Sequence, residues 1–326
     1  MDNGVARTPP MGWCSWNFYH RLFNSTVFME AADAMAENGM RELGYEYINV
    51  DGGWWAGSDT GTIVRNATGY VQVNPDKYPN GIQPVIDYVH SKGFKYGHYT
   101  DSGTAACNGD KPMSEGYEKQ DVALFVSWGI DMIKVDACHR TESAETVMDR
   151  WHTLLNATGR SVLLSDCHNG CETGEWEPWC ASANNMWRSS SDIRATWDSF
   201  LHNLDTLKGR GAFGKPGAWN DPDFLEVGIQ EFADDGSTRA LNMNRAHFSM
   251  WTITSSPLIA GVPLGNATSA IIKVLTNKAA IDVNQAYAGN AGDLVKVLVP
   301  GSSMEGGELW AKPLPDDSAA VILFNR

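Results

Sequence analysis

Aspartates that follow predicted β-strands are the residues of this sequence best placed to do chemistry. Each stands at or just beyond the C-terminal end of a short apolar segment, and they are Asp51, Asp101, Asp136, Asp166, Asp192 and Asp221. Their spacings of 50, 35, 30, 26 and 29 residues fit one strand, one helix and the loops between them. In a parallel barrel the C-terminal ends of all strands meet at one face, so we expect these carboxylates to surround a common site.

Two of these aspartates could divide the work of cleaving an acetal. On the predicted strand DMIKVD, alternation places Lys134 and Asp136 on one face, and we expect the lysine to keep the aspartate ionised as a nucleophile. Asp192 is then the expected proton donor, with Arg188 four residues earlier as a fixed cation. Glycoside hydrolysis needs this pair of roles. The structural alternatives are a buried ion pair for Lys134 and Asp136 and a helix N-cap for Asp192.

Alternating helices and strands provide the frame for these residues. Apolar residues recur at helical spacing over 27–38, and the segment 45–50 that follows has the pattern of a strand. With a first strand near 11–16 and a last near 257–261, the strand count reaches eight. The sequence therefore predicts an α/β fold, a (β/α)₈ TIM barrel.

The barrel is expected to occupy residues 1–289. From 290 to 326 short apolar segments alternate with Gly and Pro turns and show no helical period. This pattern predicts the start of a C-terminal antiparallel β-sandwich domain, which we expect to be incomplete in this sequence.

A doubly wound sheet is the competing architecture, and it would need a glycine-rich nucleotide loop. Gly209, Gly211 and Gly214 match that pattern. They follow a helical segment rather than a first strand, so we interpret them as a flexible connection.

Composition and charge narrow the class of partner. The chain has 326 residues, of which 43% are hydrophobic, and a net charge of 25 − 39 = −14. Such a negative field disfavours nucleic acid and bare membrane surfaces as partners. Six cysteines and four sequons, at Asn24, Asn66, Asn156 and Asn266, favour a secreted or a lysosomal or vacuolar glycoprotein with disulfides. A homo-oligomer is compatible with the sequence.

A metal-dependent hydrolase is a second possible class. Histidines and aspartates at strand ends could hold an ion, and the candidates are His98, Asp101, His139, Asp166 and His168. Cys167, Cys171 and Cys180 with His168 could also resemble a zinc cluster. The sequence contains no HExxH, and the acidic chain favours a disulfide among those cysteines, so we predict no metal.

Aromatic residues give a hint about the substrate. The chain has 13 tryptophans, and several lie near the expected strand ends, namely Trp13, Trp16, Trp54, Trp55, Trp187 and Trp219. Flat apolar rings on one rim could stack on the C–H faces of a sugar, although any single tryptophan is more often packing.

The motifs together resemble those of glycoside hydrolase family 27, the clan D melibiases. Six segments carry the resemblance in order: TPPMGWCSWN at 8–17, YINVDGGW at 47–54, KYGHYTDSGTAAC at 95–107, WGIDMIKVDAC at 128–138, WRSSSDI at 187–193 and WNDPDFLEVG at 219–228. The resemblance implies a (β/α)₈ barrel followed by a β-sandwich. It implies an α-galactosidase acting on oligosaccharides or glycoconjugates, with no cofactor.

The resemblance also assigns roles to individual residues. It implies Asp136 as nucleophile and Asp192 as acid/base in a double displacement with retention. A family disulfide corresponds to Cys107 and Cys138. The implied sugar contacts are Trp13, Asp51, Tyr99, Lys134, Arg188 and Asp223.

Two departures from the family leave the choice of sugar open. Most α-galactosidases carry two adjacent acids that bind the 4- and 6-hydroxyls, whereas this chain has Asp51 and then Gly52, and Gly53 replaces a family cysteine. Where relatives have Glu or Ser after the fifth strand, this chain has His168 beside Cys167. A glucose-releasing isomalto-dextranase-like enzyme and a β-L-arabinopyranosidase are the alternatives within the family. A catalytically inactive carbohydrate-binding protein is the alternative of another class.

Overall fold

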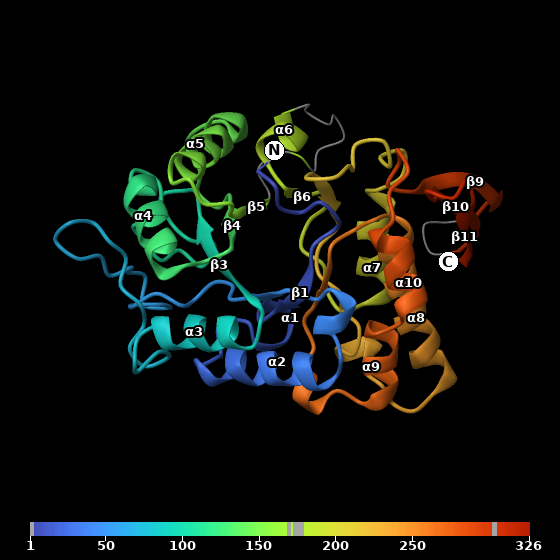
Figure 1. The fold of residues 1–326 in the computed structure, drawn as a ribbon, viewed down its shortest axis with the longest axis horizontal. Coiled ribbons are helices and arrows are strands. Elements are labelled where there is room, and N and C mark those ends of the chain that lie inside the picture. Colours follow the sequence, from blue (N-terminus) through green and yellow to red (C-terminus); the bar gives the residue numbers. More distant parts are fainter. Residues whose placement is uncertain (1–2, 168–170, 172–178, 302–304) are drawn as a thin grey trace.

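Eight short parallel strands form the centre of the protein, as a computed structural model that describes residues 3–167, 171, 179–301 and 305–326 shows (Figure 1). The strands pair in the order β7-β6-β5-β4-β3-β2-β1-β8. Their bounds are Met11–Cys14 (β1), Tyr47–Asn49 (β2), Lys95–Asp101 (β3), Met132–Asp136 (β4), Leu163–Asp166 (β5), Met186–Arg188 (β6), Trp219–Asp221 (β7) and Leu258–Ala260 (β8). A parallel bridge between Leu225 and Ala260 links the segment after β7 to β8. The predicted (β/α)₈ barrel is confirmed.

Helices cover the outside of this barrel (Figure 1). They are α1 (Trp16–Tyr19), α2 (Thr26–Glu37), α3 (Gln83–Ser91), α4 (Glu118–Trp128), α5 (Ala144–Ala157), α6 (Trp179–Ala183), α7 (Trp197–Asp205), α8 (Thr238–Ile253), α9 (Ser269–Leu275) and α10 (Lys278–Gln285). Short 3₁₀ turns lie at Arg41–Leu43, Gln230–Phe232 and Leu264–Asn266. No helix in the described ranges has the length and apolar character needed to cross a membrane.

Local sequence explains why the helices begin where they do. The side chains of Ser143, Thr196 and Ser237 accept hydrogen bonds from backbone N–H groups in the first turns of α5, α7 and α8. These caps satisfy donors that have no partner inside the helix. Helix starts are thereby fixed, and with them the strand ends that carry the site.

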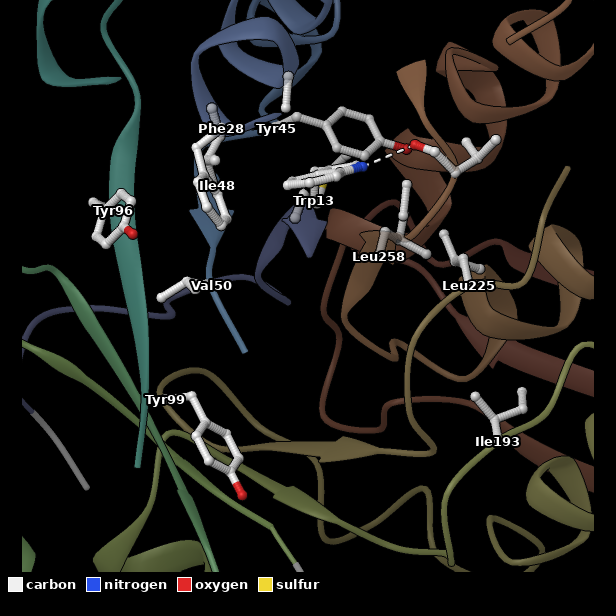
Figure 2. Close-up of a cluster of buried hydrophobic side chains, with 14 of the residues drawn as sticks. Trp13, Phe28, Tyr45, Ile48, Val50, Tyr96, Tyr99, Ile193, Leu225 and Leu258 are labelled. Carbon is white, nitrogen blue, oxygen red and sulfur yellow. Dashed lines mark hydrogen bonds between the residues drawn. The ribbon is translucent and has the colours of Figure 1, made fainter. Parts of the chain in front are cut away.

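The core between strands and helices is dense in aromatic rings, as Figure 2 shows for part of it. Phe28 of α2 is fully buried, and its ring centroid lies 6.2 Å from that of Trp13 and 6.1 Å from that of Tyr96. Because these rings come from α2, β1 and β3, they fix the helix layer against neighbouring strands.

A three-stranded antiparallel sheet follows the barrel, in the order β11-β10-β9. Its strands are β9 (Asp293–Val299), β10 (Gly307–Pro313) and β11 (Ala319–Asn325). Trp310 and Phe324 are buried in the core that the sheet shares with the barrel helices. Along β11, Val321 and Leu323 alternate with Ile322 and Phe324 and are 56% and 75% exposed. The division into a barrel at 1–289 and a separate β domain from 290 remains a prediction.

The glycine-rich segment at 209–214 connects these two parts. The backbone N–H groups of Gly209 and Gly211 donate to the two carboxylate oxygens of Asp293, at 2.7 and 3.1 Å. These donors therefore hold the first residue of β9, and the interpretation of the segment as a flexible connection stays a prediction.

Candidate active site

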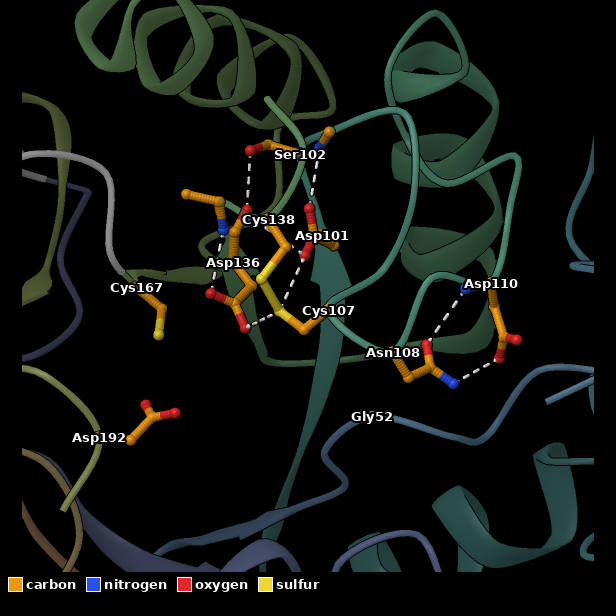
Figure 3. Close-up of a disulfide and its surroundings, with 12 residues drawn as sticks. Gly52, Asp101, Ser102, Cys107, Asn108, Asp110, Asp136, Cys138, Cys167 and Asp192 are labelled. Atoms are coloured by element: carbon orange, nitrogen blue, oxygen red, sulfur yellow. Dashed lines mark hydrogen bonds between the residues drawn. A yellow bond between two sulfur atoms is a disulfide. The ribbon is translucent and has the colours of Figure 1, made fainter. Parts of the chain in front are cut away.

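A cavity opens at the C-terminal ends of the barrel strands. Asp136, at the end of β4, and Asp192, in the loop after β6, both line it. Figure 3 shows their carboxylates on opposite sides of this space. The other lining residues are Trp16, Arg21, Asp51, Gly52, Trp55, Tyr99, Ala106, Cys107, Asn108 and Lys134. The structure thus brings five of the eight predicted site residues together around one cavity.

Asp136 is buried and held by two hydrogen bonds. The Tyr99 hydroxyl donates to Oδ2 at 2.9 Å, and the backbone N–H of Ala137 donates to Oδ1 at 3.0 Å. Both donors stabilise the charged form of the carboxylate. Asp136 is 8% exposed, so it can reach the cavity while most of its surroundings exclude water.

Lys134 forms its ion pair with Asp51 rather than with Asp136, which corrects the expected pairing. Its Nζ lies 2.8 Å from Asp51 Oδ2. Burial alone would lower the pKa of Lys134, but the Asp51 carboxylate holds that pKa well above its ordinary value. Burial raises the pKa of Asp51 even with this partner. Asp136 therefore receives its hydrogen bonds from Tyr99 and the backbone, whereas Lys134 pairs with Asp51 in the loop after β2.

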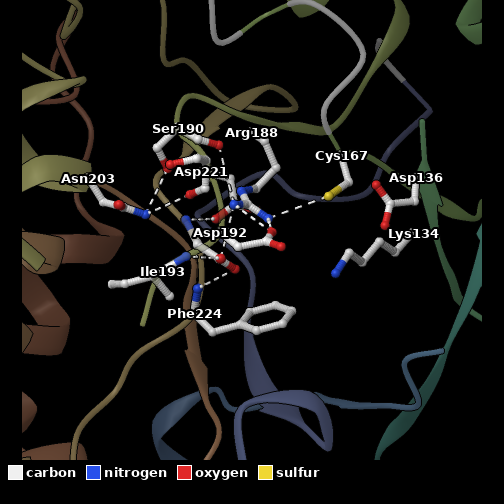
Figure 4. A network of polar contacts seen from close by, with 12 residues as sticks. Lys134, Asp136, Cys167, Arg188, Ser190, Asp192, Ile193, Asn203, Asp221 and Phe224 are labelled. Atoms are coloured by element: carbon white, nitrogen blue, oxygen red, sulfur yellow. Dashed lines mark hydrogen bonds and ion pairs between the residues drawn. The ribbon is translucent and has the colours of Figure 1, made fainter. Parts of the chain in front are cut away.

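Asp192 lies in a more open environment. Its side chain is 70% exposed, and Oδ1 is 3.2 Å from Nη1 of Arg188 (Figure 4). Arg188 is 3% exposed, and its Nη2 is 3.0 Å from Oδ2 of Asp223. Burial lowers the pKa of Arg188, but Asp223, Cys167, Asp221 and Asp192 together raise that pKa well above its usual value. One buried cation is thus surrounded by several acidic groups.

A disulfide joins Cys107 and Cys138 beside the nucleophile candidate, which confirms the pairing implied by the resemblance. Sγ of Cys107 lies 3.4 Å from Oδ2 of Asp136 and 3.4 Å from Oδ2 of Asp101 (Figure 3). The bridge ties the loop after β3 to the loop after β4. It therefore fixes the two strand ends that carry these carboxylates.

A second disulfide joins Cys171 and Cys180, and Cys167 belongs to neither bridge. The predicted bridge among these three cysteines is therefore confirmed. Two of the sulfurs that a zinc cluster would need are already bonded to each other. His168, its fourth candidate ligand, lies outside the described residues.

His98, another of the metal candidates, packs among aromatic rings. The His98 ring lies 4.3 Å from the Trp54 ring and 4.7 Å from the Phe125 ring, centroid to centroid. It faces the helix layer, whereas Asp101 on the same strand contacts the disulfide. Burial lowers the pKa of His98 to about 3, so the ring is a neutral core residue.

Trp13 does not line this cavity, and its assignment as a sugar contact stays a prediction. Its indole N–H donates to the Val262 carbonyl at 2.8 Å, and its ring packs against Tyr19 and Phe28 in the helix layer. Trp16, three residues later, lines the cavity instead. Trp16 is the first residue of α1, whereas Trp13 belongs to β1, so the turn between the two elements separates their side chains.

Two lining residues, Arg21 and Asn108, had no signal in the sequence, because both belong to loops. Trp16 and Trp55 also line the cavity and were among the aromatic residues expected near strand ends. Nε of Arg21 is 2.8 Å from Oδ1 of Asp59. Nδ2 of Asn108 donates to Oδ2 of Asp110 at 2.8 Å, and the backbone N–H groups of Asp59 and Gly61 donate to the same Asp110 carboxylate.

The position of Gly52 is lined by aromatic rings. A Cβ built there would lie 3.6 Å from Tyr99, 3.7 Å from Trp16 and 3.7 Å from Trp55, which is ordinary contact. A small side chain would therefore fit at its first carbon. At Gly53, with φ of +95°, a Cβ would meet Arg21 at 2.7 Å. Arg21 thus packs directly over the glycine that replaces the family cysteine.

Two buried acids near the site couple the stability of the fold to pH. Burial, and then the charge of Asp136, raises the pKa of Asp101 to about 8. Burial, and then the charge of Asp223, raises the pKa of Glu226 to about 9. Both carboxyls keep their protons in the folded chain at about pH 7, whereas the unfolded chain has lost them above about pH 5.5.

We expect the free energy of unfolding to fall as pH rises from about 6.5 to about 8. Stability from a raised carboxyl pKa is present at low pH and lost as pH rises through the folded value. His98 and His247, with pKa lowered by burial to about 3, are neutral in both states over most of this window. Lys312, with pKa lowered by burial to about 7, offsets one acid above that pH. The net loss is about 1 kcal/mol per pH unit.

Urea unfolding at several pH values across this window measures the effect. The variant Glu226→Gln stays neutral in both states, so its stability should depend less steeply on pH. A stability that rises over the window, or a variant with the slope of the parent, would contradict this assignment.

An eight-stranded α/β barrel with two aspartates facing each other across an aromatic-lined cavity at its strand ends has the design of a glycoside hydrolase. The chain belongs to the family described as alpha galactosidase A, whose model matches residues 8–286. It is 40% identical over 332 residues to a probable alpha-galactosidase of Dictyostelium discoideum, covering 100% of this chain and 79% of that one. It is 39% identical to alpha-galactosidase 2 of Arabidopsis thaliana, covering 100% and 77%.

A solved structure agrees with this assignment. The alpha-galactosidase of Saccharomyces cerevisiae with raffinose superposes with a TM-score of 0.84 at 26% identity, covering 99% of this chain and 75% of that one. The predicted family membership is therefore confirmed, and the chain is a glycoside hydrolase.

Proposed function

We propose that this protein is a retaining exo-α-galactosidase that removes terminal α-galactosyl residues from oligosaccharides or glycoconjugates. The observation that carries the proposal is the single cavity lined by both Asp136 and Asp192. Asp136 is held by two hydrogen-bond donors, as a nucleophile requires, and Asp192 is exposed, as a residue that exchanges protons with water requires.

The reaction has two steps. An Asp136 oxygen bonds to the anomeric carbon while the bond from that carbon to the leaving oxygen breaks, and Asp192 gives its proton to the leaving oxygen. Asp192, now a carboxylate, then takes a proton from water as the water oxygen attacks the same carbon. The bond to Asp136 breaks, and both aspartates return to their starting states.

Side chains around the cavity provide the sugar contacts. We assign this role to Asp51, Tyr99 and Lys134, which line the cavity as the resemblance implied. The Lys134–Asp51 pair offers one donor and one acceptor side by side, which suits neighbouring hydroxyls. We assign a stacking role to Trp16, one of the aromatic residues expected near the strand ends, because it lines the cavity.

The first-formed product tests the mechanism. Hydrolysis of melibiose followed by ¹H NMR should release α-galactose first, with the β anomer growing in later by mutarotation. Initial release of β-galactose would exclude double displacement.

Gly52 leaves two alternatives to galactose as the sugar that is released, namely glucose and L-arabinose. The described lining of the cavity carries aromatic rings around this glycine where most relatives have a second acid. Initial rates on the p-nitrophenyl α-galactoside, α-glucoside and β-L-arabinopyranoside separate the three activities. If an α-1,6-glucan is cut and the galactoside is untouched, the galactosidase assignment fails. Sugar binding without release of product would instead indicate a lectin.

Glycosylation is a further expectation, because we assign the protein to the secretory route. All four sequon asparagines are exposed. Asn24 and Asn66 share one local geometry, in which the side-chain oxygen accepts from the N–H and hydroxyl of the sequon threonine. Protein from a eukaryotic host should become lighter on treatment with an N-glycanase. Peptide mapping that finds all four asparagines unmodified would contradict the assignment.

A further inference from the structure

Asp223 does not lie in the cavity lining, although the resemblance assigns it to the sugar. Its carboxylate is 4% exposed, and both oxygens are engaged by the protein. Oδ1 accepts from the N–H of Phe224 at 2.8 Å. Oδ2 accepts from the N–H of Ile193 at 2.8 Å and lies 3.0 Å from Nη2 of Arg188. These contacts leave it little capacity to bind a hydroxyl.

The contact with Ile193 acts on the loop that carries Asp192. Ile193 follows Asp192 directly, so a hydrogen bond to its N–H fixes the backbone from which the Asp192 side chain projects. The Asp192 side chain itself is 70% exposed. The loop is therefore anchored by Asp223, which lies in the segment just after β7.

The backbone of Asp223 is strained to make this anchor. Its φ is +84°, a region that residues other than glycine seldom adopt. The conformation is fixed by its own N–H, which donates to Asp221 Oδ1 at 2.8 Å, and by its carbonyl, which accepts from the Trp251 indole at 2.8 Å. Strain held in place by several bonds beside a reactive group indicates a functional demand.

The contact of Asp223 with Arg188 reduces the positive charge that Asp192 experiences. An arginine alone beside Asp192 would favour the carboxylate form and weaken it as an acid. Asp223 lies closer to the same guanidinium, and unlike Asp192 it is buried with it. Asp221 and Cys167 also face this cation, and Lys134 and Asp136 stand across the cavity. Asp223 thus compensates much of the charge that Asp192 would otherwise meet.

We propose that Asp223 is a positioning residue for the general acid, which anchors the Asp192 loop through Ile193 and neutralises Arg188 so that Asp192 can hold its proton. The inference rests on the proposed function, because it assigns Asp192 the proton that the leaving oxygen receives. It predicts that replacing Asp223 slows hydrolysis only of substrates whose leaving group needs protonation.

Two substrates separate this role from sugar binding. Melibiose has a poor leaving group that requires protonation, whereas α-galactosyl fluoride releases fluoride with little help. In Asp223→Asn, kcat/KM for melibiose should fall about 100-fold and that for the fluoride less than about fivefold. The alkaline limb of the melibiose profile should move to lower pH, because Arg188 then stabilises the Asp192 anion more strongly.

Two variants of Asp223 and one control variant separate a specific effect on catalysis from a loss of folding. Asn and Gly are the residues that best tolerate a positive φ, so Asp223→Asn and Asp223→Gly are both expected to fold. Asp317 has φ of +61° on the exposed turn before β11, and Asp317→Asn should leave both rates unchanged. Equal losses on both substrates, with a raised KM and an unmoved alkaline limb, would overturn the inference and make Asp223 a sugar contact. A parent enzyme that cleaves neither substrate would instead overturn the proposed function.

Discussion

Asp136→Asn should lower kcat/KM for every α-galactoside by about 10⁴-fold or more, since the amide cannot form the glycosyl ester. The fold should survive, because the carboxamide oxygen can still accept from Tyr99 or from Ala137. The loss should be equally large for melibiose and for α-galactosyl fluoride, because the first bond to carbon is needed with either leaving group.

The stereochemistry of rescue gives this prediction a second readout. In Asp136→Gly, added azide should take the place of the missing carboxylate and attack from the same face, which yields β-galactosyl azide. Asp131, at the other end of the same strand, provides the matched control. It contacts His90 and Arg160 away from the cavity, so Asp131→Asn should change stability by about 1 kcal/mol and leave turnover intact. Appreciable turnover by Asp136→Asn would exclude it as the nucleophile.

Asp192→Ala should produce a loss that depends on the leaving group. Without a proton donor, kcat/KM for melibiose should fall about 10³-fold, whereas α-galactosyl fluoride should lose about tenfold or less in the first step. The glycosyl-enzyme should then accumulate, because no base activates water. Stability should change little, since the side chain is mostly exposed.

Azide distinguishes this variant from the nucleophile variant. It should enter the space left by Asp192 and attack the intermediate from the face opposite Asp136, which releases α-galactosyl azide. Recovery of the β azide from Asp192→Ala would reverse the roles of the two aspartates. A uniform loss on both substrates would show that Asp192 acts in binding.

Much of the fold was predictable because strand ends and acids coincide. Asp101, Asp136, Asp166 and Asp221 are the last residues of their strands, as the alternation of apolar segments indicated. The short strand β1 ends at Cys14, earlier than expected, because the chain turns into α1 at Trp16. Backbone hydrogen bonding determines where a strand ends, and local composition predicts that position only approximately.

The site was predictable where it follows strands and less so where it follows loops. Asp51, Tyr99 and Lys134 were expected and line the cavity. Arg21 and Asn108 reach it through loops whose course depends on tertiary contacts such as the Arg21–Asp59 pair. Asp223 is a third case. Its sequence motif placed it near the site, but only the structure shows that its carboxylate oxygens bind other groups of the protein.

The Cys107–Cys138 bridge has a practical consequence for making this enzyme. If the chain folds in a reducing cytoplasm, two free thiols will stand where the bridge now touches Asp136, and the two loops will lose their tether. Protein from a bacterial cytosol should then fold its barrel and yet turn over poorly, while export to an oxidising compartment should restore full specific activity. The choice of expression host thereby becomes a variable of the catalytic site.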